Sequence, residues 1–173
     1  MSPKMGESAR RDYSHAFVDS KGDSILIKTL DESMYQGLIE MYLAYQPRDS
    51  FEGLPPIKDT ACVEWVQGMI RNGINLVAVS SEGSIVGHAA IFPIDQQRCE
   101  LLVVVSPSFQ NIGVGTELTR SGVHFAREVG FEQVWLSVEA RNARAKHVFK
   151  KCGFGCLSGE DRGDMEMALD LKR

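Results

Sequence analysis

The spacing of hydrophobic residues predicts about six or seven strands in this chain. Residues 24–28 (SILIK) alternate between apolar and polar side chains, as a strand with one buried face does. Residues 99–105 (CELLVVV) are almost all apolar, which is typical of a central strand covered on both faces. Further strand-like runs lie at 74–80, 85–93, 133–138, 154–158 and 165–171.

Four other stretches have the three-to-four-residue period of an amphipathic helix. The first follows a T-x-x-E capping box at 29–32, and the second lies between 59 and 73. The third runs from Val114 to Gly130, and the fourth is capped by Asn142. The resulting order, β-α-α-β-β-β-α-β-α-β-β, predicts a single α/β (α+β) domain in which about four helices flank a mixed central sheet.

Composition narrows the class of protein. With 173 residues, 43% of them hydrophobic, the chain can bury one core. We expect this domain over residues 24–173, after a polar and loosely packed N-terminal arm at 1–23. No apolar run is long enough to span a membrane and the first residues carry no secretory signal, so we expect a cytoplasmic protein without a membrane partner.

Charge and cysteine spacing limit the partners further. The net charge of −4 argues against binding of nucleic acid. The four cysteines lack the paired spacing of a zinc site, so we expect buried, inert thiols and no metal at Cys62, Cys99, Cys152 and Cys156.

The stretch 110–115 (QNIGVG) is the strongest candidate for chemistry. It joins an apolar strand to a helix, so it leaves backbone N–H groups unpaired at a helix N-terminus, where an anion can bind. Its two glycines allow a diphosphate to approach the backbone closely. A dinucleotide fingerprint does not fit because Leu118 stands at its third glycine, and a P-loop does not fit because no lysine follows. An ordinary glycine-containing turn is the remaining alternative.

Two motifs in the chain resemble those of the GCN5-related N-acetyltransferase (GNAT) family. Residues 103–118 (VVVSPSFQNIGVGTEL) are similar to its motif A, Q/R-x-x-G-x-G/A after a strand. Residues 142–154 are similar to its N-x-x-A-x-x-x-Y-x-K-x-G-F block. The resemblance covers residue 24 to the C-terminus and implies a GNAT fold with acetyl-CoA as co-substrate.

The resemblance also implies which residues hold the coenzyme. Residues 110–116 would bind the pyrophosphate, mostly through main-chain donors. The backbone at Val103 and Val105 would pair with the pantetheine arm like an added strand, and Asn142 would touch that arm. The full set of implied coenzyme-binding residues is Val103, Val104, Val105, Gln110, Asn111, Ile112, Gly113, Val114, Gly115, Thr116, Asn142, Ala145, Phe149 and Lys151.

The residues that would move protons depart from the family pattern. Phe149 stands where family members often carry a tyrosine acid, and Cys99 stands where they often carry a glutamate base. Glu100 is a candidate base, although strand alternation directs it to the face opposite Cys99. His88 and Glu139, on neighbouring predicted strands, are further candidates that could act through water.

We therefore expect an acetyltransferase that moves an acetyl group from acetyl-CoA to a primary amine by direct attack in a ternary complex. We expect the acceptor to be a small-molecule or protein amine. The sequence leaves the oligomeric state open, and a homodimer is one of the possibilities. The loop at 46–58 is expected to choose the acceptor, and its Asp49 and Glu52 either hold a cation or are simply solvated. The alternatives are a non-catalytic acyl-CoA-binding module and a nucleotide-binding or interaction domain of another fold.

Overall fold

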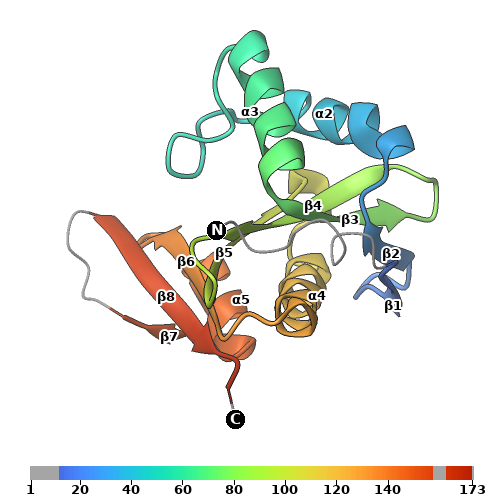
Figure 1. The fold of residues 1–173 in the computed structure, drawn as a ribbon. Coiled ribbons are helices and arrows are strands. Elements are labelled where there is room, and N and C mark those ends of the chain that lie inside the picture. The colour runs from blue at the N-terminus through green and yellow to red at the C-terminus, as the bar shows by residue number, and fades with distance from the viewer. Residues whose placement is uncertain (1–11, 158–162, 173) are drawn as a thin grey trace.

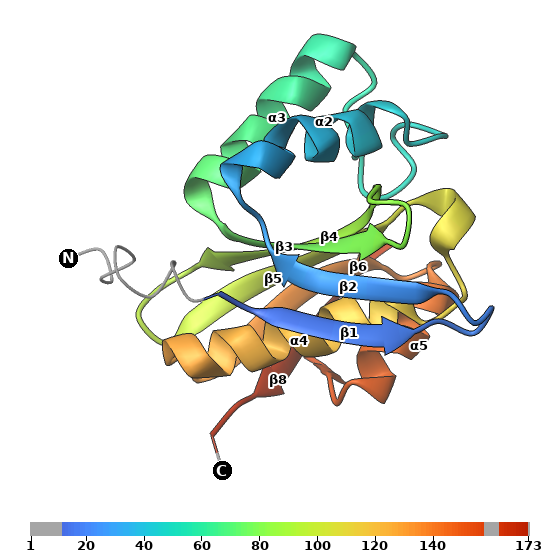
Figure 2. The same cartoon turned by 90° about the vertical axis from the view of Figure 1, so that its right-hand side faces the viewer.

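One mixed sheet of eight strands, in the order β1-β2-β3-β4-β5-β6-β8-β7, runs through the protein (Figures 1 and 2). The computed structural model describes residues 12–157 and 163–172. Every neighbouring pair is antiparallel except β5 and β6, which run parallel. The strands are β1 (Ser14–Val18), β2 (Ser24–Thr29), β3 (Ile74–Ser80), β4 (Ile85–Pro93), β5 (Arg98–Val105), β6 (Gln133–Glu139), β7 (Gly155–Cys156) and β8 (Asp164–Asp170).

Helices cover both faces of the sheet. Figure 1 shows α2 (Tyr35–Leu43) and α3 (Asp59–Asn72) on one face, and α4 (Val114–Val129) and α5 (Ala143–Lys151) on the other. Two short 3-10 turns, η1 (Glu32–Met34) and η2 (Pro107–Phe109), precede α2 and α4. Two apolar clusters follow from this arrangement, one under α2 and α3 and a larger one under α4 and α5. The predicted fold class is confirmed, with one strand more than expected.

The additional strand is β1, and it corrects the expectation of a loosely packed arm. Residues 14–18 pair with β2 along their whole length. The Tyr13 hydroxyl donates to Ser121 Oγ in α4 at 2.9 Å, and His15 Nε2 lies 3.1 Å from the Glu117 carboxylate. Residues 1–11 of the predicted arm lie outside the described part of the chain. The domain therefore begins well before residue 24.

Two other local predictions are wrong. Thr29 ends β2 rather than capping a helix, and its hydroxyl accepts from the Tyr13 backbone N–H at 3.1 Å. The side chain of Asp31 caps the following turn instead, by accepting from the Ser33 N–H. Among the described residues, strand β7 also covers only two of the positions predicted at 154–158.

Two glycines let α4 lie close to the sheet. A Cβ atom at Gly122 would stand 2.9 Å from Leu101 Cδ1 in β5, and one at Gly87 in β4 would stand 2.6 Å from Leu118 Cδ1. Both distances are shorter than carbon atoms tolerate without a shift of the neighbour. The helix that follows the QNIGVG stretch is thus seated firmly on β4 and β5.

Candidate active site

The cleft begins where β5 and β6 part. Their parallel pairing covers only Arg98–Glu100 against Gln133–Trp135, whereas the other edge of β5 stays paired with β4 as far as Val105. Beyond this point, residues 101–105 have no strand partner on the β6 side within the described chain. The separation opens a cleft of about 1260 Å³ whose walls include β5, β6, α5 and the loop after α2.

Residues 110–115 (QNIGVG) form one end of this cleft. We call them the anion-binding loop after their predicted role. Gly113 holds a left-handed conformation at φ 99°, and Asn111 does so at φ 65°. In the described chain, no protein group accepts a hydrogen bond from the backbone N–H groups of residues 111–116. Such consecutive free donors at the start of a sixteen-residue helix suit a phosphate group.

Helix α5 brings positive charge to the same end. The Asn142 side chain caps the helix by accepting from the Ala145 N–H at 3.1 Å, as predicted. Arg144 donates to Gln110 Oε1 at 2.9 Å, and Gln110 Nε2 donates to the Val105 carbonyl at 3.0 Å. We call the basic side chains that line this part of the cleft the basic end: Arg141, Arg144, His147 and Lys151.

Nearly all of the predicted coenzyme-binding residues line the cleft. The two exceptions are Ile112 and Val114, which are 7% and 0% exposed and belong to the core beneath α4. Phe149 lies at the cleft and packs against Phe154, with ring centroids 5.9 Å apart.

The cleft is also lined by two carboxylates, Glu52 from the loop after α2 and Glu139 from the end of β6. Glu52 Oε1 accepts from Ser137 Oγ at 2.8 Å, and the Glu52 backbone N–H donates to Glu139 Oε1 at 2.6 Å. The structure therefore brings residue 52 against the end of β6, although the two are far apart in the sequence. The sequence alone indicates for Glu52 either a cation ligand or a solvated residue of the acceptor loop.

Burial and neighbouring negative charges raise the pKa values of two carboxyl groups in this region. Burial raises the pKa of Glu52, and the charges of Asp164 and Glu139 raise it further. Burial also raises the pKa of Glu100, with Glu52 as the second cause. We call these four residues, Glu52, Glu100, Glu139 and Asp164, the acidic wall; Glu52 and Glu139 line the cleft, whereas Glu100 and Asp164 do not. Within the described chain, none of them forms an ion pair.

Of the three predicted bases, Glu139 alone lines the cleft. Glu100 is half-buried on the sheet face that bears α2 and α3, together with Leu102, whereas Cys99 faces α4. This agrees with the expected alternation, because the β4–β5 register is regular at these residues. Burial raises the pKa of the Cys99 thiol to about 12, so it is inert. Cys156, by contrast, is exposed, which corrects the expectation that all four thiols are buried.

His88 is enclosed in the core instead of facing the cleft. It is 0% exposed, and burial lowers its pKa to about 3. The Asn75 amide donates to two carbonyls, those of Met69 and Gly73, so its oxygen faces His88 Nε2 at 2.8 Å. His88 Nε2 therefore carries the proton, and Nδ1 accepts from the Tyr42 hydroxyl at 2.7 Å. Burial with both ring nitrogens occupied argues against a catalytic role.

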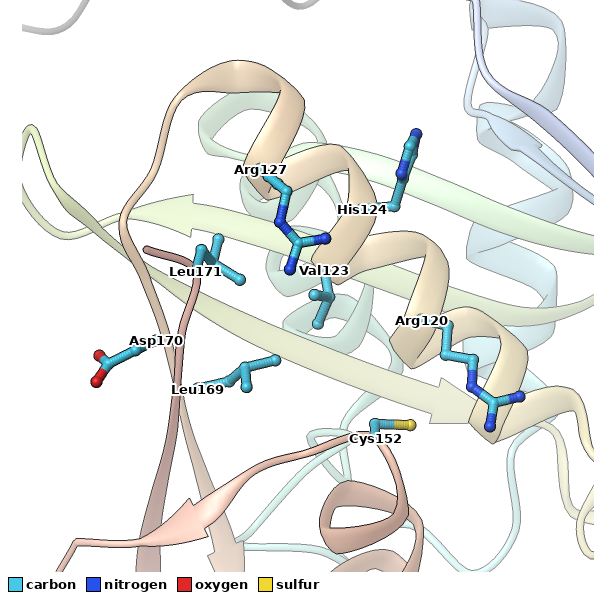
Figure 3. Close-up of a pocket in the computed structure, with 8 residues that line it drawn as sticks. All are labelled: Arg120, Val123, His124, Arg127, Cys152, Leu169, Asp170 and Leu171. Atoms are coloured by element: carbon cyan, nitrogen blue, oxygen red, sulfur yellow. The ribbon is translucent and has the colours of Figure 1, made fainter. Parts of the chain in front are cut away.

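A second hollow, of about 380 Å³, is lined by α4, by the end of β8 and by Cys152 (Figure 3). It shares no lining residue with the cleft and contains none of the predicted coenzyme-binding residues. Arg120 at its edge is paired with Glu117 at 3.1 Å. Within the described residues, no group of three or more histidine, cysteine or acidic side chains is placed to hold a metal ion, and no helix is long and apolar enough to cross a membrane.

Comparison with known proteins identifies the family. The profile of the Acetyltransferase (GNAT) family matches residues 35–154, a range that contains the anion-binding loop and α5. The chain belongs to the GNAT acetyltransferase family. The resemblance inferred from the two sequence motifs is thereby confirmed, and the family supports acetyl transfer as the general activity.

Curated relatives of this GNAT chain match about half of it. It is 36% identical over 90 residues to a streptothricin acetyltransferase of Streptomyces lavendulae, a match that covers 51% of this chain and 48% of that protein. It is also 36% identical over 87 residues to a mycothiol acetyltransferase of Propionibacterium freudenreichii, covering 48% of this chain and 28% of that protein. The chain thus spans half or less of the length of these relatives.

Solved structures match the GNAT fold over nearly the whole chain. The GNAT domain of S. lividans PAT has a TM-score of 0.79 at 16% identity, covering 91% of this chain and 97% of that one. The yncA protein of Salmonella typhimurium, solved with acetyl-CoA, has a TM-score of 0.69 at 19% identity and covers 86% and 94%. At these identities the likeness concerns the fold.

Proposed function

We propose that this GNAT protein transfers an acetyl group from acetyl-CoA to a primary amine, by direct attack while both substrates are bound. The observation that carries the proposal is the single cleft between β5 and β6. It is lined by the anion-binding loop, by the basic end and by the carboxylates of Glu52 and Glu139. A cleft of this polarity suits an anionic donor and a cationic acceptor.

The residues present fit acetyl-CoA. The free N–H groups of residues 111–116 would hold the pyrophosphate, and Lys151 and Arg144 would add positive charge beside it. The unpaired edge of residues 101–105 offers backbone groups to the amide-containing pantetheine arm. Phe149 gives that arm an apolar contact.

The acceptor must lose a proton before it attacks, because a protonated amine has no free electron pair. Glu139 lines the cleft, and only one of its carboxylate oxygens, Oε1, is engaged within the described chain. We assign it the proton-accepting role, directly or through one water. When bound, acetyl-CoA supplies the activated acetyl group as a thioester. A backbone N–H at the free edge of β5 can stabilise the charge that develops on the carbonyl oxygen.

The second departure from the family pattern is the lack of a tyrosine at position 149 that could donate a proton to the departing thiolate. Phe149 has no proton to donate, and we propose that none is required. An unperturbed thiol has a pKa of about 8.5, so its thiolate is already a fair leaving group near neutral pH. Water in the open cleft can protonate it afterwards.

Two measurements test the function together. Calorimetry should show acetyl-CoA binding, and a thiol-release assay over polyamines, aminoglycosides, amino acids and peptide amines should show turnover. Gly113→Ala should weaken acetyl-CoA binding by about tenfold, because an alanine at φ 99° shifts the loop that holds the phosphates. Gly83→Ala is the matched control, since Gly83 has φ 84° in a turn remote from the cleft.

Each contrary result has a distinct meaning. Equal loss of affinity in both glycine variants would contradict a phosphate-binding role for the loop. Tight acetyl-CoA binding without turnover of any amine would contradict acetyl transfer and favour the non-catalytic acyl-CoA-binding module.

A further inference from the structure

The acidic wall holds more negative charge than the reaction itself requires. One carboxylate suffices to accept the proton of the attacking amine, and Glu139 has a free oxygen for that task. Glu52 lies beside it and also lines the cleft. The attacking amine must be neutral. Once the amine has lost its proton, it carries no positive charge that a second carboxylate could bind.

Glu52 is held at the cleft by specific contacts. Its backbone adopts φ 52°, an uncommon value for a residue with a side chain. Its N–H is bonded to Glu139, and Oε1 is bonded to Ser137. Behind it, Tyr45 and Phe51 pack edge to face with ring centroids 5.6 Å apart, and both also line the cleft. The loop thus presents the Glu52 carboxylate at the cleft, where it contacts Ser137 and the neighbouring acid Asp164 and pairs with no arginine or lysine of the described chain.

The basic and acidic side chains of the cleft come from different segments of the chain. All four residues of the basic end come from the segment 141–151, which adjoins the anion-binding loop. The acidic wall comes from four separate segments, and no described arginine or lysine pairs with any of its members. Glu52 and Glu139 repel each other at close range, so a cation between them would relieve the repulsion.

We propose that the acceptor is a small molecule with at least two amino groups, and that Glu52 is the residue that selects it by binding the second, unreacted ammonium. This inference rests on the proposed function and narrows its substrate class. Glu139 accepts the proton of the reacting amine, Glu52 binds the distant ammonium group, and Ser137 orients Glu52. The anionic donor occupies the basic end, so the two substrates do not compete for the same charges.

Matched pairs of amines test the selection. Turnover is measured with 1-aminobutane, 4-amino-1-butanol and 1,4-diaminobutane, and with the corresponding five- and six-carbon series. We expect the diamine to exceed both single amines of equal length in kcat/KM by about tenfold, since a partly exposed ion pair contributes a modest but measurable preference.

Glu52→Gln keeps an oxygen for Ser137 and the backbone bond to Glu139, but removes the charge. It should raise KM for the diamines by about fivefold to tenfold relative to its effect on the single amines, which share only the change at Glu139. Glu82→Gln is the control, because Glu82 is exposed in the β3–β4 turn. Equal use of single amines and diamines by the unaltered enzyme, or equal losses for both in Glu52→Gln, would overturn the proposal.

A binding measurement separates this proposal from the proposed function. Calorimetry of 1,4-diaminobutane and 1-aminobutane is performed on the protein saturated with CoA, where no reaction occurs. Diamine binding that weakens in Glu52→Gln supports the selection even if no amine is ever acetylated. Diamine binding equal to that of the single amine, or unchanged in Glu52→Gln, overturns it even if acetyl transfer is demonstrated.

Discussion

Among single residues, His88 joins three elements that are distant in the sequence. Its ring lies in β4, accepts from Tyr42 in α2 and donates to Asn75 in β3. Helix α2 leads directly into the loop that carries Glu52, so this buried network fixes the origin of that loop. A polar residue within an apolar strand therefore serves packing here, with every polar atom of the imidazole satisfied.

The pH dependence of stability should report on His88. Its pKa lies at about 3 in the folded protein and near 6.5 when exposed, so the unfolded chain binds a proton that the folded chain excludes. Stability is then lost as the pH falls below about 6.5. The loss from this group is ~2 kcal/mol between pH 7 and pH 5, measurable by urea unfolding. His88→Gln cannot titrate and should lose stability less steeply; an identical slope would refute the assignment.

The candidate site was predictable where it follows a local pattern. The residues predicted to bind the coenzyme lie in two continuous motifs, and most of them line one cleft in the structure. Glu52 could be named only as a general loop acid, because its approach to Ser137 depends on a contact across 85 positions. His88 was misjudged for a related reason, since its burial depends on Tyr42 and Asn75 from other elements.

Among the elements, β5 does the most to place the site. One edge pairs with β4, the other is free beyond Glu100, and its α4 face packs against the helix that begins at the anion-binding loop. The sequence predicted this strand and α4 almost to the residue, because both are long and strongly periodic. Strand β1 escaped notice because SHAFV is short and four of its five residues are exposed, so no hydrophobic period marks it.

The close approach of α4 and β5 can be measured by substitution. Gly122→Ala should lower the free energy of unfolding by about 1–2 kcal/mol, because the new methyl group displaces Leu101 from a filled core. Gly68→Ala in α3 meets no atom within 4 Å. It should instead stabilise the protein by up to about 1 kcal/mol through helix propensity. Equal stabilisation of both variants, in urea titrations, would show that the helix is not tightly seated.

At the scale of the whole molecule, the N-terminal hairpin supports the anion-binding loop from the β1 edge of the sheet. The Ser20 backbone N–H, just after β1, donates to the Ile112 carbonyl at 3.0 Å. Together with the contacts of Tyr13 and His15 on α4, this bond holds the loop from behind. A unit defined as residues 24–173 would therefore lack part of the support for its own site.

Truncation tests that support. Removal of residues 1–23 should lower the melting temperature by roughly 5–10 °C, since it strips a strand from the sheet and uncovers β2. Acetyl-CoA affinity should fall as well. Removal of residues 1–11 alone keeps every contact described for β1, and this variant serves as the control in calorimetry and thermal unfolding. Indistinguishable behaviour of the two truncations would show that the hairpin is dispensable.

The free edge of β5 also bears on how the protein behaves in concentrated solution. Residues 101–105 present a row of apolar side chains and unpaired backbone groups toward an open cleft. An exposed strand edge of this kind is a template on which a segment of another chain can pair. A ligand lying along β5 would occupy that edge, so saturation with the coenzyme should protect stored protein against self-association as well as preparing it for catalysis.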